Sequence, residues 1–203
     1  MSAELEQFWK GDFGNDYHQR NEGRIESNEH LFRVILDCNE LAPTSVLEFG
    51  AGPGQNLIAL KRILPDIETI AVEINLQAVE AMQTSGKIDA TIVSSIQEFN
   101  PAEITAELVL TKGLLIHLAP EDLPRAYQVL HACSREWLLV CEYYCPTPRE
   151  INYRGNTGKA WARDFAGELL DTYKDLRLVD YGFRYRRDKY PQDDLTWFLM
   201  EKA

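Results

Sequence analysis

The stretch that decides the fold is residues 46–54, which read Val-Leu-Glu-Phe-Gly-Ala-Gly-Pro-Gly. The apolar run before the glycines predicts a buried strand. Gly50, Gly52 and Gly54 allow a sharp turn whose bare backbone can approach a ligand. Residues 55–64 then carry leucines at helical spacing, which predicts a helix directly after the turn. Strand, glycine turn and helix therefore follow one another, as in ligand-binding α/β proteins.

The spacing of these glycines distinguishes two kinds of nucleotide-binding turn. The dinucleotide fingerprint is G-x-G-x-x-G/A, whose third small residue allows close packing of helix on strand. That position is Gln55 here, and the third glycine falls instead at Gly54, after the acidic strand residue Glu48. This pattern resembles motif I of the class I S-adenosylmethionine-dependent methyltransferases. The alternative is an ordinary strand-to-helix turn.

The resemblance implies S-adenosylmethionine as the cofactor and S-adenosylhomocysteine as its product. It also implies which residues of the turn contact the cofactor: Glu48, Gly50, Ala51, Gly52 and Asn56.

Composition and charge favour a small-molecule enzyme of one domain. The chain has 203 residues, of which 45% are hydrophobic and 26% charged, so we expect one α/β domain. Its formal net charge of −11 disfavours nucleic acid and anionic membranes as partners. No run approaches the roughly 20 apolar residues of a membrane helix, and the first residues are acidic rather than signal-like, so we expect a cytoplasmic location.

The four cysteines do not have the spacing of a metal site. Cys38, Cys133 and Cys141 lie in apolar segments, and with Cys145 they form no C-x-x-C pair. We expect thiols packed in the core and no bound metal.

Further along the chain, apolar runs alternate with helical patterns. Strands are predicted at 68–73, 90–93, 108–111 and 137–141. Helices are predicted from Leu76, from Pro120 and after the N-cap Asp164. Strand and helix in alternation specify a parallel sheet covered on both faces. Final strands near 178–185 and 195–201, joined by a short polar loop, predict an antiparallel hairpin.

The predicted fold class is therefore α/β, with a Rossmann-like, doubly wound, mostly parallel seven-stranded sheet that ends in an antiparallel hairpin. We expect a single domain, 1–203. Within it we expect an N-terminal helical cap over 1–42, a cofactor-binding core over 43–142, and a substrate-side segment with the hairpin over 143–203.

Polar residues that end the predicted strands are the best ligand candidates, because ligands of α/β sheets bind at the carboxyl ends of the strands. Glu73 ends the second strand, about 20 residues beyond the glycine turn, where a carboxylate can accept both ribose hydroxyls. A solvated strand-end acid is the alternative. The residues expected to flank the ribose and adenine are Ile74, Asn75, Ser94, Ser95 and Ile96, although 94–96 can also be read as a simple turn.

Residues 111–118, Thr-Lys-Gly-Leu-Leu-Ile-His-Leu, resemble motif IV of the same superfamily. The resemblance implies that Lys112, Gly113 and Leu114 line the pocket near the methionine portion, with His117 near the transferred methyl group. Methyl transfer from a sulfonium needs mainly alignment, and a base is required only where the nucleophile must lose a proton. For an alcohol acceptor an imidazole suits this role. A histidine that only packs at a strand-to-helix corner is the alternative.

The two ends of the chain resemble a narrower family. Residues 8–21, Phe-Trp-Lys-Gly-Asp-Phe-Gly-Asn-Asp-Tyr-His-Gln-Arg-Asn, look like the opening signature of the pseudaminic acid biosynthesis-associated methylases. Later motifs of that family are matched at 142–150, 153–155, 163–165 and 193–198. The name implies a role near the synthesis of nonulosonic acid sugars on bacterial surfaces and leaves the acceptor open.

The segment before the first strand can fold over the cofactor. Trp9, Tyr17 and Arg20 are the candidates there, and a guanidinium such as that of Arg20 suits the cofactor's carboxylate. The alternatives are aromatic core packing for Trp9 and Tyr17 and a surface salt bridge for Arg20.

Cations gather after the fifth strand of this acidic chain. Arg149, Arg154 and Arg163 suit an anionic acceptor, and Tyr143 and Tyr144 suit contact with a sugar ring or hydroxyl. A solvated loop balancing nearby acids is the alternative.

Together the patterns predict an S-adenosylmethionine-dependent methyltransferase, a monomer or homodimer, that acts on a small acceptor. An acidic or nucleotide-activated sugar methylated on oxygen is the favoured class. Two rivals stay open: a non-catalytic S-adenosylmethionine-binding module and an NAD-dependent oxidoreductase.

Overall fold

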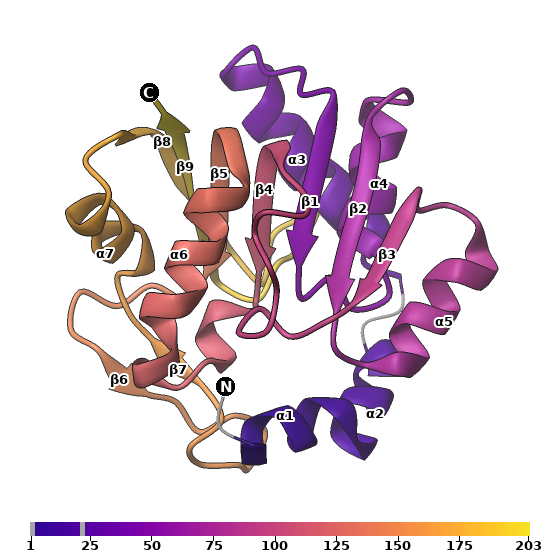
Figure 1. Cartoon of the computed structure of the whole chain (residues 1–203), viewed down its shortest axis with the longest axis vertical. Coiled ribbons are helices and arrows are strands. Elements are labelled where there is room, and N and C mark those ends of the chain that lie inside the picture. The colour runs from indigo at the N-terminus through magenta and orange to yellow at the C-terminus, as the bar shows by residue number, and fades with distance from the viewer. Residues whose placement is uncertain (1–2, 21–22) are drawn as a thin grey trace.

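A single seven-stranded sheet forms the centre of the molecule (Figure 1). The structure is a computed structural model that describes residues 3–20 and 23–203, with the side chains of 4–17 and 23–203. The strand order is β3-β2-β1-β4-β5-β9-β8. The strands are β1 (Ser45–Phe49), β2 (Glu68–Glu73), β3 (Ala90–Val93), β4 (Ala106–Lys112), β5 (Ser134–Glu142), β8 (Leu176–Arg184) and β9 (Leu195–Lys202).

The predicted fold class is confirmed. β1 to β5 pair in parallel, whereas β9 pairs antiparallel with both β5 and β8. The crossing from β3 back to β4, on the far side of β1, places the switch in strand order between β1 and β4. Ligand sites of open α/β sheets form beside such a switch, at the carboxyl ends of the strands.

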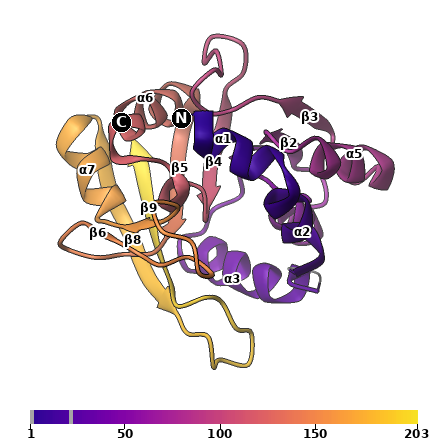
Figure 2. The ribbon, with the colours of Figure 1, turned by 90° about the horizontal axis from the view of Figure 1, so that it is seen from below.

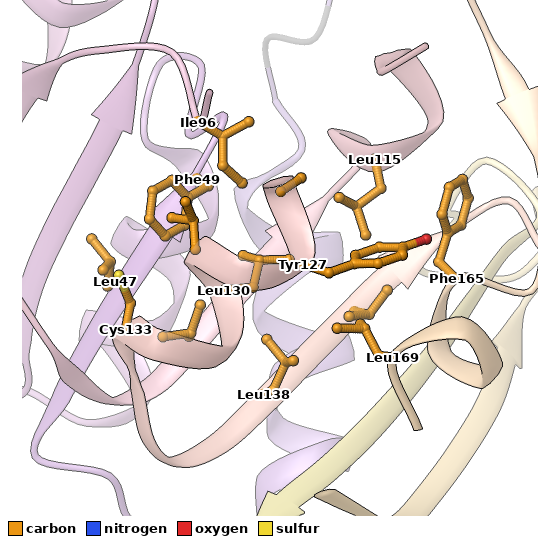
Figure 3. Packing of buried hydrophobic residues seen from close by; sticks show 14 of the residues in the cluster. Leu47, Phe49, Ile96, Leu115, Tyr127, Leu130, Cys133, Leu138, Phe165 and Leu169 are labelled. Atoms are coloured by element: carbon orange, nitrogen blue, oxygen red, sulfur yellow. The ribbon is translucent and has the colours of Figure 1, made fainter. Parts of the chain in front are cut away.

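Helices cover both faces of the sheet, because successive side chains of a buried parallel strand point to opposite sides. In β1, Leu47 and Phe49 pack in one apolar cluster with α6 (Leu123–Cys133) and α7 (Phe165–Thr172). Figure 3 shows this cluster around Tyr127. Val46 faces the other cluster, with α3 (Ile25–Cys38), α4 (Gln55–Ile63) and α5 (Leu76–Ser85).

Most element bounds agree closely with the sequence patterns. β2 and β3 coincide with the predicted 68–73 and 90–93, and the Asp164 side chain caps α7 by accepting from the Gly167 amide at 2.8 Å. The helix predicted from Pro120 begins later: Pro120 opens the 3₁₀ helix η2 (Pro120–Asp122), and α6 follows with Pro124 in its first turn, where a missing N–H costs little.

Two features differ from the sequence-based expectation. The segment 146–163, for which the sequence patterns predict no strand, contains a small antiparallel pair, β6 (Arg149–Glu150) with β7 (Trp161–Ala162), too short to give a periodic pattern. Cys38 is exposed at the end of α3, so the prediction of a core thiol is wrong there, while Cys133 and Cys141 are buried. All four cysteines are free.

The amino-terminal helices α1 (Ala3–Lys10) and α2 (Asp12–Arg20) lie across the carboxyl ends of the parallel strands (Figures 1 and 2). Within residues 3–20 and 23–203, no helix is both long and apolar enough to cross a bilayer. The helices α1 and α2 thus cover the carboxyl ends of the strands at the switch in strand order. The 3₁₀ helix η1 (Leu115–His117) follows β4 at the same end of the sheet.

Core packing between α4 and the sheet should dominate stability. Leu57 of α4 is fully buried, whereas Leu76 at the start of α5 is 67% exposed. We expect Leu57→Ala to lower the free energy of unfolding by about 2–5 kcal/mol, because it removes buried methyl groups and leaves a cavity. Leu76→Ala, the matched control, should change it by less than about 0.5 kcal/mol. Urea denaturation measures both, and equal losses would contradict the packing described.

Candidate cofactor and acceptor site

The glycine turn after β1 packs closely against two neighbours, Leu114 after β4 and Met82 of α5, which leaves little room for side chains at Gly50 and Gly54. Gly50 and Gly54 have φ of +70° and +75°, in the left-handed region that favours glycine. A Cβ on Gly50 would lie 2.9 Å from Leu114 Cδ1, and one on Gly54 would lie 3.0 Å from the Met82 sulfur. The turn therefore presents bare backbone toward the carboxyl end of β4.

Glu73, at the end of β2, fixes the geometry of this turn. One carboxylate oxygen accepts the Gly52 amide at 2.7 Å, and the other accepts the amides of Ile74 and Asn75, both at 2.8 Å. The side chain is 8% exposed and lines the cavity in front of the turn. A buried negative charge is thereby held by three backbone donors at the floor of a cavity.

A narrow first cavity of about 80 Å³ lies at the ends of β1, β2, β3 and β4. The four strand ends bring together residues far apart in the sequence. Thirteen of the residues predicted to contact the cofactor line it: Trp9, Tyr17, Gly50, Gly52, Glu73, Ile74, Asn75, Ser94, Ser95, Ile96, Lys112, Gly113 and Leu114.

The other predicted cofactor residues lie elsewhere. Glu48 is fully buried behind the turn, where Asn56 Nδ2 donates to it at 2.6 Å, and burial raises its pKa to about 8. It lines neither cavity of the described chain. Ala51 and Asn56 line the second cavity instead. Arg20 ends α2, and its side chain lies outside the described residues.

A wider second cavity of about 360 Å³ adjoins the first. The two share the walls formed by Tyr17, Lys112 and His117 and by the glycine turn. Of the predicted acceptor residues, Tyr143 and Arg154 line the second cavity. The lining residues that the sequence analysis did not predict are Arg24, Asn28, Pro53, Gln55, Ile116, Tyr153, Arg186, Gln192, Asp193, Asp194 and Leu195.

Three predicted acceptor residues are not brought into either cavity of the described chain. Tyr144 is 43% exposed and packs against Phe198, with ring centroids 5.8 Å apart. Arg149 is exposed in β6. Arg163 donates to Glu168 at 2.8 Å, and this pair ties the end of β7 to α7.

His117 stands at the junction of the two cavities. Its side chain is 6% exposed and lies between the rings of Trp9 and Tyr153, at centroid distances of 4.5 and 4.6 Å. Nδ1 lies 2.8 Å from the Lys159 carbonyl oxygen, which can only accept, so Nδ1 carries the hydrogen and Nε2 has the lone pair. Burial lowers the pKa of His117 to about 4, so the ring is neutral at pH 7.

Glu142, which the sequence analysis missed, holds the segment that carries His117. Its carboxylate accepts the amides of Leu114 and Leu115, both at 3.1 Å, and of Ile116 at 3.3 Å. Burial raises its pKa to about 7, and these donors act against that rise. The signal was available, because Glu142 directly follows the predicted fifth strand and strand-end acids were already candidates.

The amino-terminal helices are fastened over the first cavity by polar contacts. Asn75 caps α5 through the Ala78 amide at 3.0 Å, and its Nδ2 donates to the Trp9 carbonyl at 3.0 Å. Lys159 pairs with Glu4 at 2.6 Å, which ties α1 to the segment between β6 and β7. Figure 2 shows α1 and α2 crossing the strand ends.

Arg24 and Asp193 close the outer wall of the second cavity. Two guanidinium nitrogens of Arg24 donate to the two oxygens of Asp193 at 2.8 and 3.0 Å. Beside them Gln192 donates to Asn28 at 3.0 Å, and both amides are almost completely buried. These contacts join the loop between β8 and β9 to α3. The sequence gives no signal for them, because the partners are more than 160 residues apart.

Comparison with known proteins agrees with this architecture. Residues 46–136 match the family model described as a methyltransferase domain. No curated protein matches the sequence. The matched range begins in β1 and ends in β5, and so contains the glycine turn, Glu73 and His117.

Solved structures of three methyltransferases, all with bound S-adenosylhomocysteine, share the fold. A 1,6-didemethyltoxoflavin-N1-methyltransferase from Burkholderia thailandensis has a TM-score of 0.72 and 17% identity, covering 100% of this chain and 91% of the other. Magnesium protoporphyrin IX methyltransferase from Synechocystis PCC 6803 has a TM-score of 0.71 and 12% identity, covering 98% of each chain. A plantazolicin methyltransferase has a TM-score of 0.66 and 14% identity, covering 98% of this chain and 95% of the other. The chain has the class I methyltransferase fold, and the matched domain supports a methyltransferase.

Proposed function

We propose that the protein transfers a methyl group from S-adenosylmethionine to an oxygen atom of a small anionic acceptor, sugar-related or nucleotide-linked. The observation that carries the proposal is the pair of adjoining cavities at the strand switch, lined by the glycine turn and His117, with Glu73 in the wall of the first. The bound S-adenosylhomocysteine in the three similar structures supports the choice of cofactor. The resemblance to pseudaminic acid biosynthesis-associated methylases supports a sugar-related acceptor.

The residues of the first cavity fit this cofactor. The backbone of Gly50 provides a surface that a side chain would block, and Glu73 offers a buried carboxylate for ribose hydroxyls. Ile96 provides an apolar wall for adenine. Trp9 Nε1 is a buried donor with no partner among the described residues, and it suits a polar atom of a ligand.

S-adenosylmethionine supplies a methyl group on a positively charged sulfur, and the acids and aromatic rings of the cavity suit that charge. Glu73 is an acid of the cavity wall, and Trp9 and Tyr17 line the cavity with it. Arg20, at the end of α2, is the candidate for the cofactor's carboxylate.

Entry of such a ligand requires α1 and α2 to move outward. The first cavity measures about 80 Å³, whereas sites for ligands of this size usually measure roughly 300–1,000 Å³. We therefore propose that 1–42 closes over the bound cofactor, that 43–142 binds it and that 143–203 binds the acceptor. The contacts of Asn75 with Trp9 and of Lys159 with Glu4 belong to the closed arrangement.

The second cavity suits an anionic acceptor. Lys112 and Arg154 line it, as do Arg24 and Arg186, whose charges are paired with those of Asp193 and Asp194. Lys112 is held at the end of β4, and burial lowers its pKa. A cation in this position is stabilised when a negative group replaces water beside it.

His117 is placed to take the proton of an acceptor hydroxyl. The hydrogen bond to Lys159 fixes the tautomer, so Nε2 is the basic atom. Glu142 holds the preceding amides, which fixes the position of the ring. As the acceptor oxygen forms its bond to the methyl carbon, the bond from that carbon to the sulfonium sulfur breaks and its electron pair stays on sulfur, giving neutral S-adenosylhomocysteine. The proton of the acceptor hydroxyl passes to Nε2 and then to solvent.

A transfer assay tests the proposal directly. The protein is incubated with S-adenosylmethionine labelled in the methyl group and a panel of free acidic sugars, nucleotide-linked sugars and neutral sugars. Labelled product is expected only from the anionic members. Intact S-adenosylhomocysteine binding without transfer to any member would contradict the acceptor class and favour a cofactor-binding module without catalysis.

Removing the Glu73 carboxylate, the proposed hydrogen-bond acceptor for the ribose hydroxyls, should weaken cofactor binding. We expect Glu73→Ala to lower the affinity for S-adenosylhomocysteine by about 10-fold or more, because a hydrogen bond to a charged group contributes about 1.5–3 kcal/mol. Glu68→Ala, at the exposed start of the same strand, is the control and should bind normally. Calorimetry measures both variants, and an unchanged affinity for Glu73→Ala would refute this placement.

Removing the base should slow turnover while sparing cofactor binding. We expect His117→Ala to lower kcat about 100-fold, the lower range for general base catalysis, with S-adenosylhomocysteine affinity little changed. His131→Ala is the control, because His131 pairs with Asp175 at 2.8 Å and lines neither cavity. If His117→Ala still transfers methyl groups at every pH, His117 is not the base and only packs in the site.

The lowered pKa of His117 also predicts a pH dependence of stability. Its folded pKa is about 4 against 6.5 in model compounds, so the unfolded chain binds more protons between these values. Its contribution to stability is therefore lost as pH falls through this window, by about 2 kcal/mol between pH 7 and pH 5. We expect the free energy of unfolding of His117→Gln, measured by urea denaturation, to fall less between pH 7 and pH 5 than that of the unmodified protein. Equal losses in the two proteins would contradict a buried neutral ring.

A further inference from the structure

The hairpin between β8 and β9 concentrates positive charge in an acidic protein. Residues 184–189 read Arg-Tyr-Arg-Arg-Asp-Lys, four cations in six residues of a chain with net charge −11. Arg186, Arg187 and Lys189 are exposed and Arg184 is half-buried. Such a segment creates a local positive potential that the net charge of the chain does not predict.

Most of these cations are not neutralised by neighbours. Arg186 pairs with Asp194 at 3.4 Å, but Arg184, Arg187 and Lys189 have no ion-pair partner among the described residues. The segment has one acid, Asp188, which is exposed and whose side chain accepts the Lys189 amide at 2.6 Å. The hairpin therefore carries an excess of positive charge that an external anion can balance.

The charged segment continues from the second cavity. Arg186 lines that cavity together with Asp194 and Leu195. Arg184 pairs in register with Leu195, and residues paired directly across two antiparallel strands point to the same face of the sheet. Arg184 of β8 thus lies on the same face of the sheet as Leu195 of β9, which lines the second cavity.

The cations form a path from the inside of the cavity to the hairpin. Lys112 lines both cavities, Arg154 and Arg186 line the second cavity, and Arg184 follows on the hairpin. The loop is held in this place by the paired Arg24 and Asp193, which fix its base to α3.

We propose that this hairpin binds a tail of closely spaced negative charges on the acceptor, while the portion that receives the methyl group enters the second cavity. The inference deepens the proposed function and rests on it. Guanidinium and ammonium groups suit both phosphate and carboxylate, and their spacing along a hairpin suits several charges rather than one. The acceptor class is then a polyanion, such as a diphosphate-linked or multiply carboxylated small molecule.

Binding of simple polyanions tests the proposal without knowledge of the acceptor. Tripolyphosphate and citrate are titrated separately into the full-length protein, with and without saturating S-adenosylhomocysteine, and followed by calorimetry. We expect at least one of them to bind with an affinity that falls as salt is added. Tighter binding of tripolyphosphate would indicate that the negative groups of the acceptor are phosphates, and tighter binding of citrate that they are carboxylates.

Charge variants locate the binding. Arg184→Gln/Arg187→Gln/Lys189→Gln should weaken the polyanion about 10-fold or more and leave S-adenosylhomocysteine affinity within about twofold. The control, Arg33→Gln/Arg62→Gln/Arg177→Gln, makes the same change in net charge at exposed sites that already have acidic partners. It should leave polyanion binding nearly unchanged.

The outcomes separate the two proposals. Equal weakening by both triple variants, or no binding of either polyanion, would overturn the hairpin site. Tighter binding of a ten-residue oligothymidylate than of either small polyanion, lost in the hairpin variant, would also overturn it in favour of a nucleic-acid surface. Failure to bind S-adenosylhomocysteine would instead refute the proposed function, because that titration does not involve the hairpin.

Discussion

The carboxylate of Glu73 joins the two backbone turns from which the site is built. It accepts one amide from the glycine turn after β1 and two from the turn after β2. Burying a carboxylate without hydrogen-bond donors costs free energy. The hydrogen bonds that Glu73 accepts from both turns therefore hold the two turns in one arrangement. The glycines allow this arrangement, because a side chain at Gly50 would collide with the segment after β4.

A second buried acid, Glu142 at the end of β5, also holds backbone amides in place. Glu142 accepts three amides from the segment that carries His117, just as Glu73 accepts three from the turns after β1 and β2. Two strand-end acids therefore position backbone, and one histidine between aromatic rings presents a neutral imidazole to the cavity. Alignment of two ligands, which methyl transfer mainly requires, follows from these fixed turns.

Sequence patterns predicted the core of this site because local residues generate it. The strand, glycine turn and helix at 46–64, and the strand-end position of Glu73, follow from periodicity and spacing alone. The outer wall could not be predicted in this way. Arg24 meets Asp193 and Asn28 meets Gln192 only because the β8–β9 loop folds back on α3, and no local pattern encodes a contact over such a separation. Arg163 was misplaced for a different reason: it pairs with Glu168, a near neighbour in the sequence on α7, and this local pair turns the guanidinium away from the cavities.

The central claim is that this cavity binds a sulfonium cofactor and not a dinucleotide. Calorimetric titration of the protein with S-adenosylhomocysteine and, separately, with NAD tests it most directly. We expect saturable binding of one S-adenosylhomocysteine per chain and no measurable heat with NAD. Binding of NAD without binding of S-adenosylhomocysteine would contradict it.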